Sequence, residues 1–174
     1  MERLEKEKRE ENRNRNRGSA LLGVIISNPK TLFNKALIDG ISNAVRSSGD
    51  HHSLMTFSLA TDTVVFSAFE CQVSLMLAEG VTGVFMRTLS DEDGKRATVK
   101  LLSRFRRAKV PVVLIGDDSA FLPKGVRCDS VAAKGGKPTP EVAMRLGGIA
   151  AHLMFQRLAD PSLASAEVLL DSLK

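Results

Sequence analysis

The sequence predicts an α/β fold, in which one domain holds an open, doubly wound and mostly parallel sheet of five strands. Two runs, Val81–Met86 and Val110–Gly116, are apolar without alternation, which is typical of strands covered on both faces of a parallel sheet. Between them, Lys95–Lys109 carries apolar residues on one helical stripe and basic residues on the opposite side. A helix between two buried parallel strands makes a right-handed crossover, and the rest of the chain repeats this unit.

Composition narrows the class of protein. The chain of 174 residues is long enough for one domain with a sizeable core, and its 43% of apolar residues excludes a disordered chain. No apolar run approaches the roughly 20 residues that span a membrane, and no apolar secretory segment follows the basic start. The two cysteines, Cys71 and Cys128, are too few for a disulfide scaffold, so we expect a cytoplasmic protein with free thiols.

The first half of the chain shows two strand and two helix patterns after a charged start. Residues 1–18 mix glutamates with basic residues, and we expect a solvated arm or a linker there. The runs Ala20–Ser27 and His52–Ala60 are predicted as strands. Helices are predicted over Leu32–Ser47 and over Thr63–Ala78, and the second has apolar residues on more than one face.

The second half adds an edge strand and a closing helix to the central unit. Val126–Ala133 alternates in polarity, which favours a strand at the edge of the sheet. Pro140–Leu158 has the pattern of an amphipathic helix, and the tail after it contains a candidate short strand, Ala166–Leu170. The predicted limits are therefore residues 1–18 for the arm, 19–161 for a single α/β lobe and 162–174 for a C-terminal tail.

The motifs of several common enzyme classes are missing from the sequence. There is no GxGxxG after the first strand, no phosphate-binding Walker loop and no GxSxG elbow. The pair His51-His52 at a strand start is expected to be exposed, and neither it nor His152 has metal-ligand spacing with a cysteine. We therefore expect no catalytic residue, no metal site and no cofactor.

Polar side chains follow the predicted strands at their carboxyl ends, which is where open parallel sheets bind ligands. A phenyl ring at this edge could cover the face of a sugar, and amide, hydroxyl and charged groups could bond a small polyol. For each residue taken alone, an ordinary capping or loop role is the simpler interpretation. The candidate ligand-binding residues are Asn28, Lys30, Phe33, Ser58, Arg87, Thr88 and Asp117.

Four stretches carry a resemblance to a known family. They are LLGVIIS with FNKALIDGISNAVRSSG, LAEGVTGVFM, LLSRFRRAKVPVVLIGDD and LGGIAAHLMFQRLADP, which together cover most of residues 20–161. In this order and spacing they resemble the effector-binding domain of the lactose-repressor/galactose-repressor family of bacterial transcription regulators, which shares the periplasmic-binding-protein fold. The resemblance implies a flavodoxin-like lobe.

The chain departs from that family in three respects. It passes from Val126–Ala133 directly to a helix similar to the one that re-enters the first lobe, so we expect the second lobe to be missing. Met1–Arg17 holds too few apolar residues for a helix-turn-helix, so DNA would be reached only through an absent partner domain. Of the family's paired aromatic site, Phe33 is present, whereas Asn34 fills the second position.

The resemblance implies a lobe that senses a small sugar or purine-like effector for a repressor-type regulator, binds it weakly and does not transform it. In this interpretation Phe33 stacks on the ligand, while Asn28, Arg87 and Asp117 hydrogen-bond its hydroxyls. One alternative is a truncated or engineered association module without a ligand, and another is a small flavodoxin-like enzyme. Because the family acts as dimers, we also expect a homodimer through first-lobe surfaces and no contact with a membrane.

Overall fold

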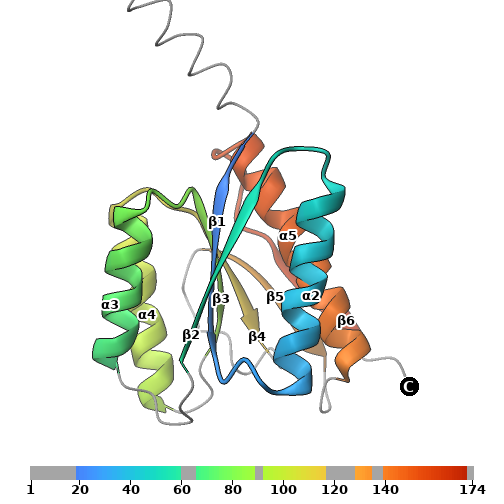
Figure 1. Ribbon diagram of the computed structural model, residues 1–174, viewed down its shortest axis with the longest axis horizontal. Helices are drawn as coiled ribbons and strands as arrows, with labels where there is room; N and C mark the ends of the chain where they lie inside the picture. The colour runs from blue at the N-terminus through green and yellow to red at the C-terminus, as the bar shows by residue number, and fades with distance from the viewer. Residues whose placement is uncertain (1–18, 60–65, 89–91, 117–127, 135–138, 172–174) are drawn as a thin grey trace, which may run out of the picture.

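In the part of the chain that the structure describes, six parallel strands form one sheet with helices on both of its faces (Figure 1). The structure is a computed structural model that describes residues 19–59, 66–88, 92–116, 128–134 and 139–171. The predicted arm, residues 1–18, lies outside these ranges. The strands are β1 (Leu21–Ser27), β2 (Ser53–Leu59), β3 (Gly83–Arg87), β4 (Val112–Gly116), β5 (Asp129–Lys134) and β6 (Glu167–Asp171). The helices are α2 (Leu32–Ser47), α3 (Phe66–Ala78), α4 (Glu92–Arg107) and α5 (Pro140–Ala159).

The strand order in the sheet is β2-β1-β3-β4-β5-β6. The predicted doubly wound parallel sheet is confirmed, and β4 lies inside it, between β3 and β5. The predicted count of five strands is wrong, because β6 adds a sixth strand beside β5 and takes the edge position expected for Val126–Ala133. β5 is buried over Asp129–Ala133, as an internal strand should be, whereas β6 alternates between exposed and half-buried residues.

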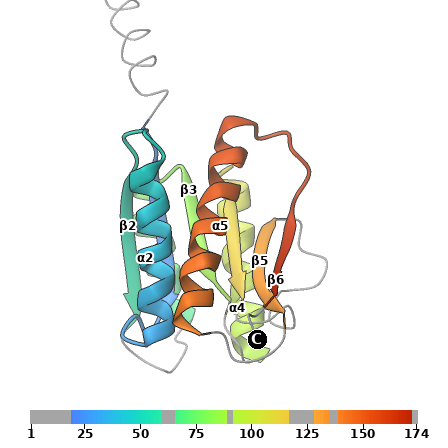
Figure 2. The same cartoon turned by 90° about the vertical axis from the view of Figure 1, so that its right-hand side faces the viewer.

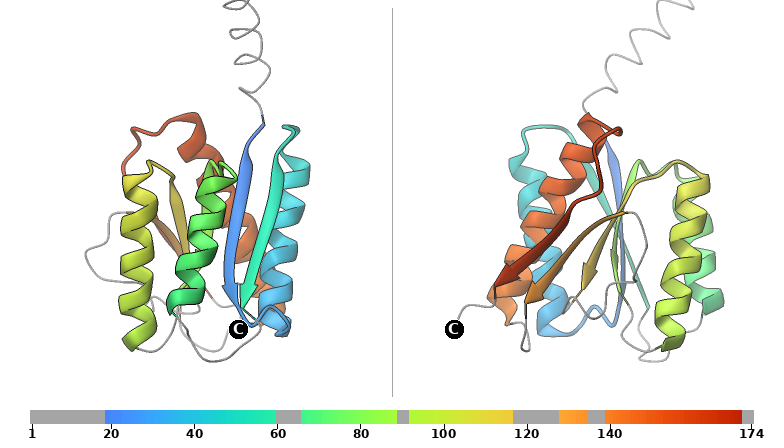
Figure 3. Two further views of the ribbon diagram at one scale, coloured as in Figure 1. Left: turned by 60° about the vertical axis from the view of Figure 1, so that its left-hand side comes forward. Right: turned by 180° about the vertical axis from the view of Figure 1, so that it is seen from behind.

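The two faces of the sheet are covered by different helix pairs. α2 and α5 lie side by side over one face (Figure 2), and α3 and α4 cover the other (Figure 3). Side chains of β1 alternate between the two faces of the sheet. Leu22, Val24 and Ile26 belong to the apolar cluster under α2 and α5, and Ile25 belongs to the cluster under α3 and α4. The closing helix α5 packs back on the sheet, as predicted.

Glycines allow α2 and α5 to approach closely. A Cβ atom built on Gly40 of α2 would lie 2.1 Å from the carbonyl oxygen of Met144 in α5. A Cβ atom built on Gly147 of α5 would lie 2.3 Å from the carbonyl oxygen of Leu37 in α2. No side chain fits at these distances, so the two helix backbones meet only because both positions are glycine.

An ion pair anchors the chain segment that leads from α5 into β6. The guanidinium of Arg157 donates two hydrogen bonds of 2.9 Å to the carboxylate of Asp129 at the start of β5. Its remaining N–H groups donate to the carbonyl oxygens of Pro161, Leu163 and Ala164, and the Asp129 carboxylate accepts from the Ala166 N–H at 2.9 Å. The segment that precedes β6 is therefore bound to both α5 and β5.

One predicted exposure is wrong. His51 is exposed as expected, but the His52 side chain is only 9% exposed. Its Nδ1 accepts a hydrogen bond from the Ala20 N–H at 3.0 Å, and its ring stacks on Phe155 of α5 with centroids 5.2 Å apart. The sequence predicts a surface residue here because the apolar partner of His52, Phe155, comes from the far end of the chain.

Candidate functional site

The sheet has a topological switch point between β1 and β3. These strands are neighbours, but the chain leaves β1 through α2 on one face and leaves β3 through α4 on the other. In open α/β sheets, ligands bind in the crevice outside the carboxyl ends of the strands at such a switch point. We call this position, at the carboxyl ends of β1 and β3, the crevice. Residues after β1 and at the end of β3 define the candidate site.

Asn34, in the first turn of α2, is fully buried, with none of its surface exposed. Its side-chain NH2 group donates to the carbonyl oxygens of Ser27 at 2.7 Å and Asn28 at 2.8 Å. Its backbone N–H donates to the hydroxyl of Thr31, which is the N-cap of α2. These bonds hold the turn after β1, where Asn28 has a φ of 46°, in one conformation.

Arg87, the last residue of β3, connects the two sides of the switch point. Its guanidinium donates to the Oδ1 atom of Asn34 and lies over the ring of Phe33, with the guanidinium carbon 4.7 Å from the ring centroid. Both contacts join the end of β3 to the start of α2. Arg87 and Asn34 are 53 positions apart in the sequence. The site thus presents a cation, an aromatic ring and a rigid polar turn at one edge.

The structure brings together several of the predicted ligand-binding residues. Asn28 and Phe33 are half-buried at the crevice beside Arg87, and Lys30 is exposed in the turn before α2. Thr88 is buried, and its backbone N–H and its hydroxyl both donate to the carbonyl oxygen of Ile115, which ties β3 to β4. Ser58 lies in β2, but its side chain and the whole of Asp117 are outside the described residues.

The position of Arg87 limits how the ring of Phe33 can contact a ligand. The sequence predicts that its ring stacks on a ligand, but one face of the ring is already covered by the guanidinium of Arg87. A ligand in the crevice would therefore meet the Arg87 plane or the remaining surface of Phe33. The sequence marks Asn34 only as a departure from the paired aromatic site and does not predict its role, because a polar residue near the start of an amphipathic helix carries no sign of a partner on a distant strand.

The described residues offer no group of three or more His, Cys, Asp or Glu side chains that could hold a metal ion. No described helix is both long and apolar enough to cross a membrane.

The chain is similar in fold to solved structures of LacI family transcriptional regulators. A LacI family regulator from Enterococcus faecalis, solved with bound ribose, matches with a TM-score of 0.61 and 12% identity over 87% of this chain and 95% of its own. A LacI family regulator, CcpA from Weissella paramesenteroides, solved with bound sucrose, matches with a TM-score of 0.50 and 14% identity over 86% of this chain and 57% of its own. Neither protein-family models nor curated proteins give a significant match.

At these identities the comparisons establish the fold. The chain has the architecture of one lobe of the periplasmic-binding-protein type, and the resemblance predicted from the sequence is confirmed at that level. It spans little more than half of the Weissella regulator, which fits a single lobe.

Proposed function

We propose that the chain is a ligand-sensing lobe of a repressor-type transcriptional regulator, and that a small polyhydroxylated molecule binds at the crevice beside Arg87 and Phe33. The observation that carries the proposal is the contact of Arg87 with Asn34 and Phe33 at the β1–β3 switch point. The similarity in fold to a regulator that holds ribose supports the same interpretation.

In this proposal the guanidinium of Arg87 and the polar turn at Asn28 bond ligand hydroxyls, and Phe33 supplies apolar contact. Lys30, Ser58, Thr88 and Asp117 remain candidates for the rim of the site. A single lobe covers one side of a ligand and leaves the other in water, whereas tight sites bury most of the ligand. We therefore expect weak binding, with a dissociation constant on the order of millimolar or above.

The solved structures with similar folds are named as transcriptional regulators, which favours sensing over catalysis. A regulator of this type would act in the cytoplasm and would reach DNA through a partner domain. The conformational signal would pass through the turn at Asn28, because Asn34 couples that turn to Arg87.

The test is an NMR titration of the ¹⁵N-labelled chain with ribose, glucose, sucrose and adenine. We expect saturable shifts in the amides of residues 27–34 and 87–88, and loss of these shifts in Arg87→Ala. The matched control is Arg46→Ala, which removes an exposed arginine at the far end of α2 and should leave the shifts unchanged. Absence of shifts with every ligand, or equal shifts in Arg87→Ala, would contradict the proposal.

A second candidate function is association without a ligand. It is favoured by large apolar side chains that lie exposed on two separate elements, with Leu75 of α3 at 49% and Leu169 of β6 at 44% exposure. The ligand titration separates it from sensing, because association alone predicts no amide shift with any of the four ligands.

A further inference from the structure

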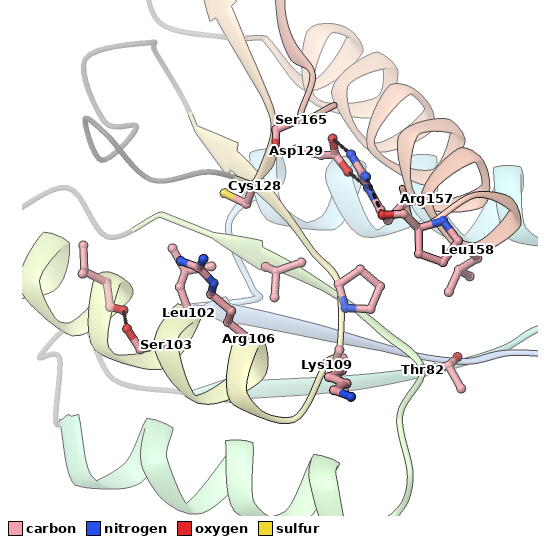
Figure 4. A pocket seen from close by; sticks show the side chains of 15 residues that line it. Thr82, Leu102, Ser103, Arg106, Lys109, Cys128, Asp129, Arg157, Leu158 and Ser165 are labelled. Carbon is pink, nitrogen blue, oxygen red and sulfur yellow. Dashed lines mark hydrogen bonds and ion pairs between the residues drawn. The ribbon is translucent and has the colours of Figure 1, made fainter. Parts of the chain in front are cut away.

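A pocket lies at the opposite end of the sheet from the crevice. It has a volume of about 760 Å³ and sits between the C-terminal half of α4, the starts of β4 and β5, and the end of α5 (Figure 4). Because β3 is five residues long, about 16 Å separates this pocket from the carboxyl edge. A ligand in one place would not touch the other. The volume falls within the range of about 300–1,000 Å³ that is usual for small-molecule sites.

The lining of the pocket combines apolar side chains with basic ones. Val99 and Leu102 of α4, Val110, Pro111 and Val112 before and in β4, and Leu158 of α5 form the apolar part. The thiol of Cys128 and the hydroxyls of Thr82, Ser103 and Ser165 add polar groups without charge at neutral pH. Such a surface suits the body of an organic molecule with few polar groups of its own.

The charges in the lining do not cancel. Three basic side chains, Arg106, Lys109 and Arg157, line the pocket together with one carboxylate, that of Asp129. Both oxygens of Asp129 accept hydrogen bonds from Arg157, so this carboxylate is already neutralised. Among the described residues, no carboxylate lies within ion-pair distance of Arg106 or Lys109. The pocket therefore carries an excess of positive charge.

The backbone at Lys109 supports a role for its side chain. α2 and α3 are each followed by a glycine with positive φ, Gly49 at 78° and Gly80 at 76°. After α4 the same left-handed conformation is adopted by Lys109, with a φ of 59°. A residue with a Cβ costs roughly 1 kcal/mol more than glycine in this conformation. The chain therefore has a lysine, whose ammonium group lines the pocket, at a position where glycine would have a lower backbone energy.

We propose that this pocket binds a small organic anion with an apolar body, such as an aromatic carboxylate or sulfonate. The body packs on Leu102, Val110 and Pro111, and Arg106, which extends from α4 beside the cavity (Figure 4), is the main contact of the anionic group. Lys109 adds a second positive charge in the lining. This site is independent of the crevice and of the function proposed for it.

The test uses two fluorescent probes that differ in charge. 8-Anilinonaphthalene-1-sulfonate is an anion with an apolar body, and N-phenyl-1-naphthylamine is its uncharged counterpart. We expect the sulfonate to bind the full chain with a stoichiometry of one and at least fivefold more tightly than the amine. Arg106→Gln should weaken the sulfonate at least fivefold and leave the amine unchanged. Arg107→Gln, an equal loss of charge on the same helix at an exposed residue outside the pocket, is the matched control and should change neither.

Lys109→Gly separates binding from folding. It should weaken the sulfonate about twofold, while the urea midpoint stays equal to or above that of the unchanged protein because glycine suits the left-handed conformation. Amide shifts induced by the sulfonate should fall in residues 99–112 and 157–165. Equal affinity for the two probes, equal effects of Arg106→Gln and Arg107→Gln, or shifts confined to residues 27–34 and 87–88 would each overturn the proposal. None of these outcomes depends on whether sugars bind at the crevice.

Discussion

Arg157 holds three parts of the chain together through one guanidinium. Replacing it by leucine leaves the Asp129 carboxylate, whose side chain is 5% exposed, without its ionic partner. Removal of one member of a buried ion pair costs about 3–5 kcal/mol, and we expect Arg157→Leu to lower the free energy of unfolding by this amount in urea titrations. Arg145→Leu, at an exposed position on the same helix, should change it by less than about 0.5 kcal/mol. Similar effects of the two substitutions would show that the pair contributes little.

Cys128 should be an unreactive thiol. Burial, with a smaller contribution from the neighbouring Asp129 carboxylate, raises the pKa of Cys128 from 9.0 to about 12. At pH 8 we therefore expect iodoacetamide to modify the exposed Cys71 and to leave Cys128 almost untouched, as peptide mass spectrometry would reveal. Equal modification of both thiols in the folded protein would contradict the expectation.

The same shift in pKa predicts how stability responds to alkaline pH. Between pH 9 and 12 the unfolded thiol loses a proton that the folded thiol retains, so ionisation favours the unfolded state as the pH rises. The free energy of unfolding should decrease by at most about 1.4 kcal/mol per pH unit from this group. Cys128→Ala removes the contribution, so its stability should fall less steeply with pH than that of the unchanged protein.

Individual side-chain roles were only partly predictable from the sequence. Asn28, Phe33 and Arg87 could be assigned to one edge, because residues that follow parallel strands meet there. The contact between Arg87 and Asn34 could not, since it depends on which two strands are neighbours and on which faces their helices leave. His52 shows the same limit, because its burial is provided by Phe155.

At the level of helices, the contact between α2 and α5 predicts unequal effects of glycine substitution. Gly40→Ala and Gly147→Ala should each destabilise the fold by about 1–3 kcal/mol or more, because the added methyl group meets a backbone carbonyl that cannot yield. Gly148→Ala is the control, since a Cβ atom there has no neighbour within 4 Å and alanine favours the helix by roughly 0.5–1 kcal/mol. Thermal unfolding followed by circular dichroism measures the stability of all three variants. A change in stability of the same sign for Gly147→Ala and Gly148→Ala would refute the close approach of the two helices.

The helices and internal strands were predictable because their patterns are strong. α2 has the predicted bounds, Leu32–Ser47, and β4 lies within an apolar run that signals burial on both faces. β6 was harder to predict as part of the sheet, because Glu167–Asp171 is short, alternates in exposure and follows a loop. The ion pair between Arg157 and Asp129 holds β6 in place, and these two residues are 28 positions apart in the sequence.

For the whole molecule we expect a homodimer. The exposed apolar residues Leu75 and Leu169 lie on different elements, and light scattering on Leu75→Glu and Leu169→Glu identifies which surface is used. Ser67→Glu, an exposed polar position on α3, is the control and should leave the mass unchanged.

A chain that starts at Gly18 tests the arm. If the full chain and the shortened chain are both monomers at high concentration, the dimer is wrong, and if only the full chain dimerises, the interface is in the arm.

The packing of α2 against α5 has a consequence for how the protein is made. Leu37 and Ile41 of α2 are buried under Val142, Leu146 and other residues of α5. Ribosomes add about 5–20 residues per second, so on the order of ten seconds pass between the emergence of the first helix and that of its cover. During this interval the nascent chain exposes an apolar helix face. A product terminated before α5 exposes it permanently and becomes a substrate for chaperones and proteases.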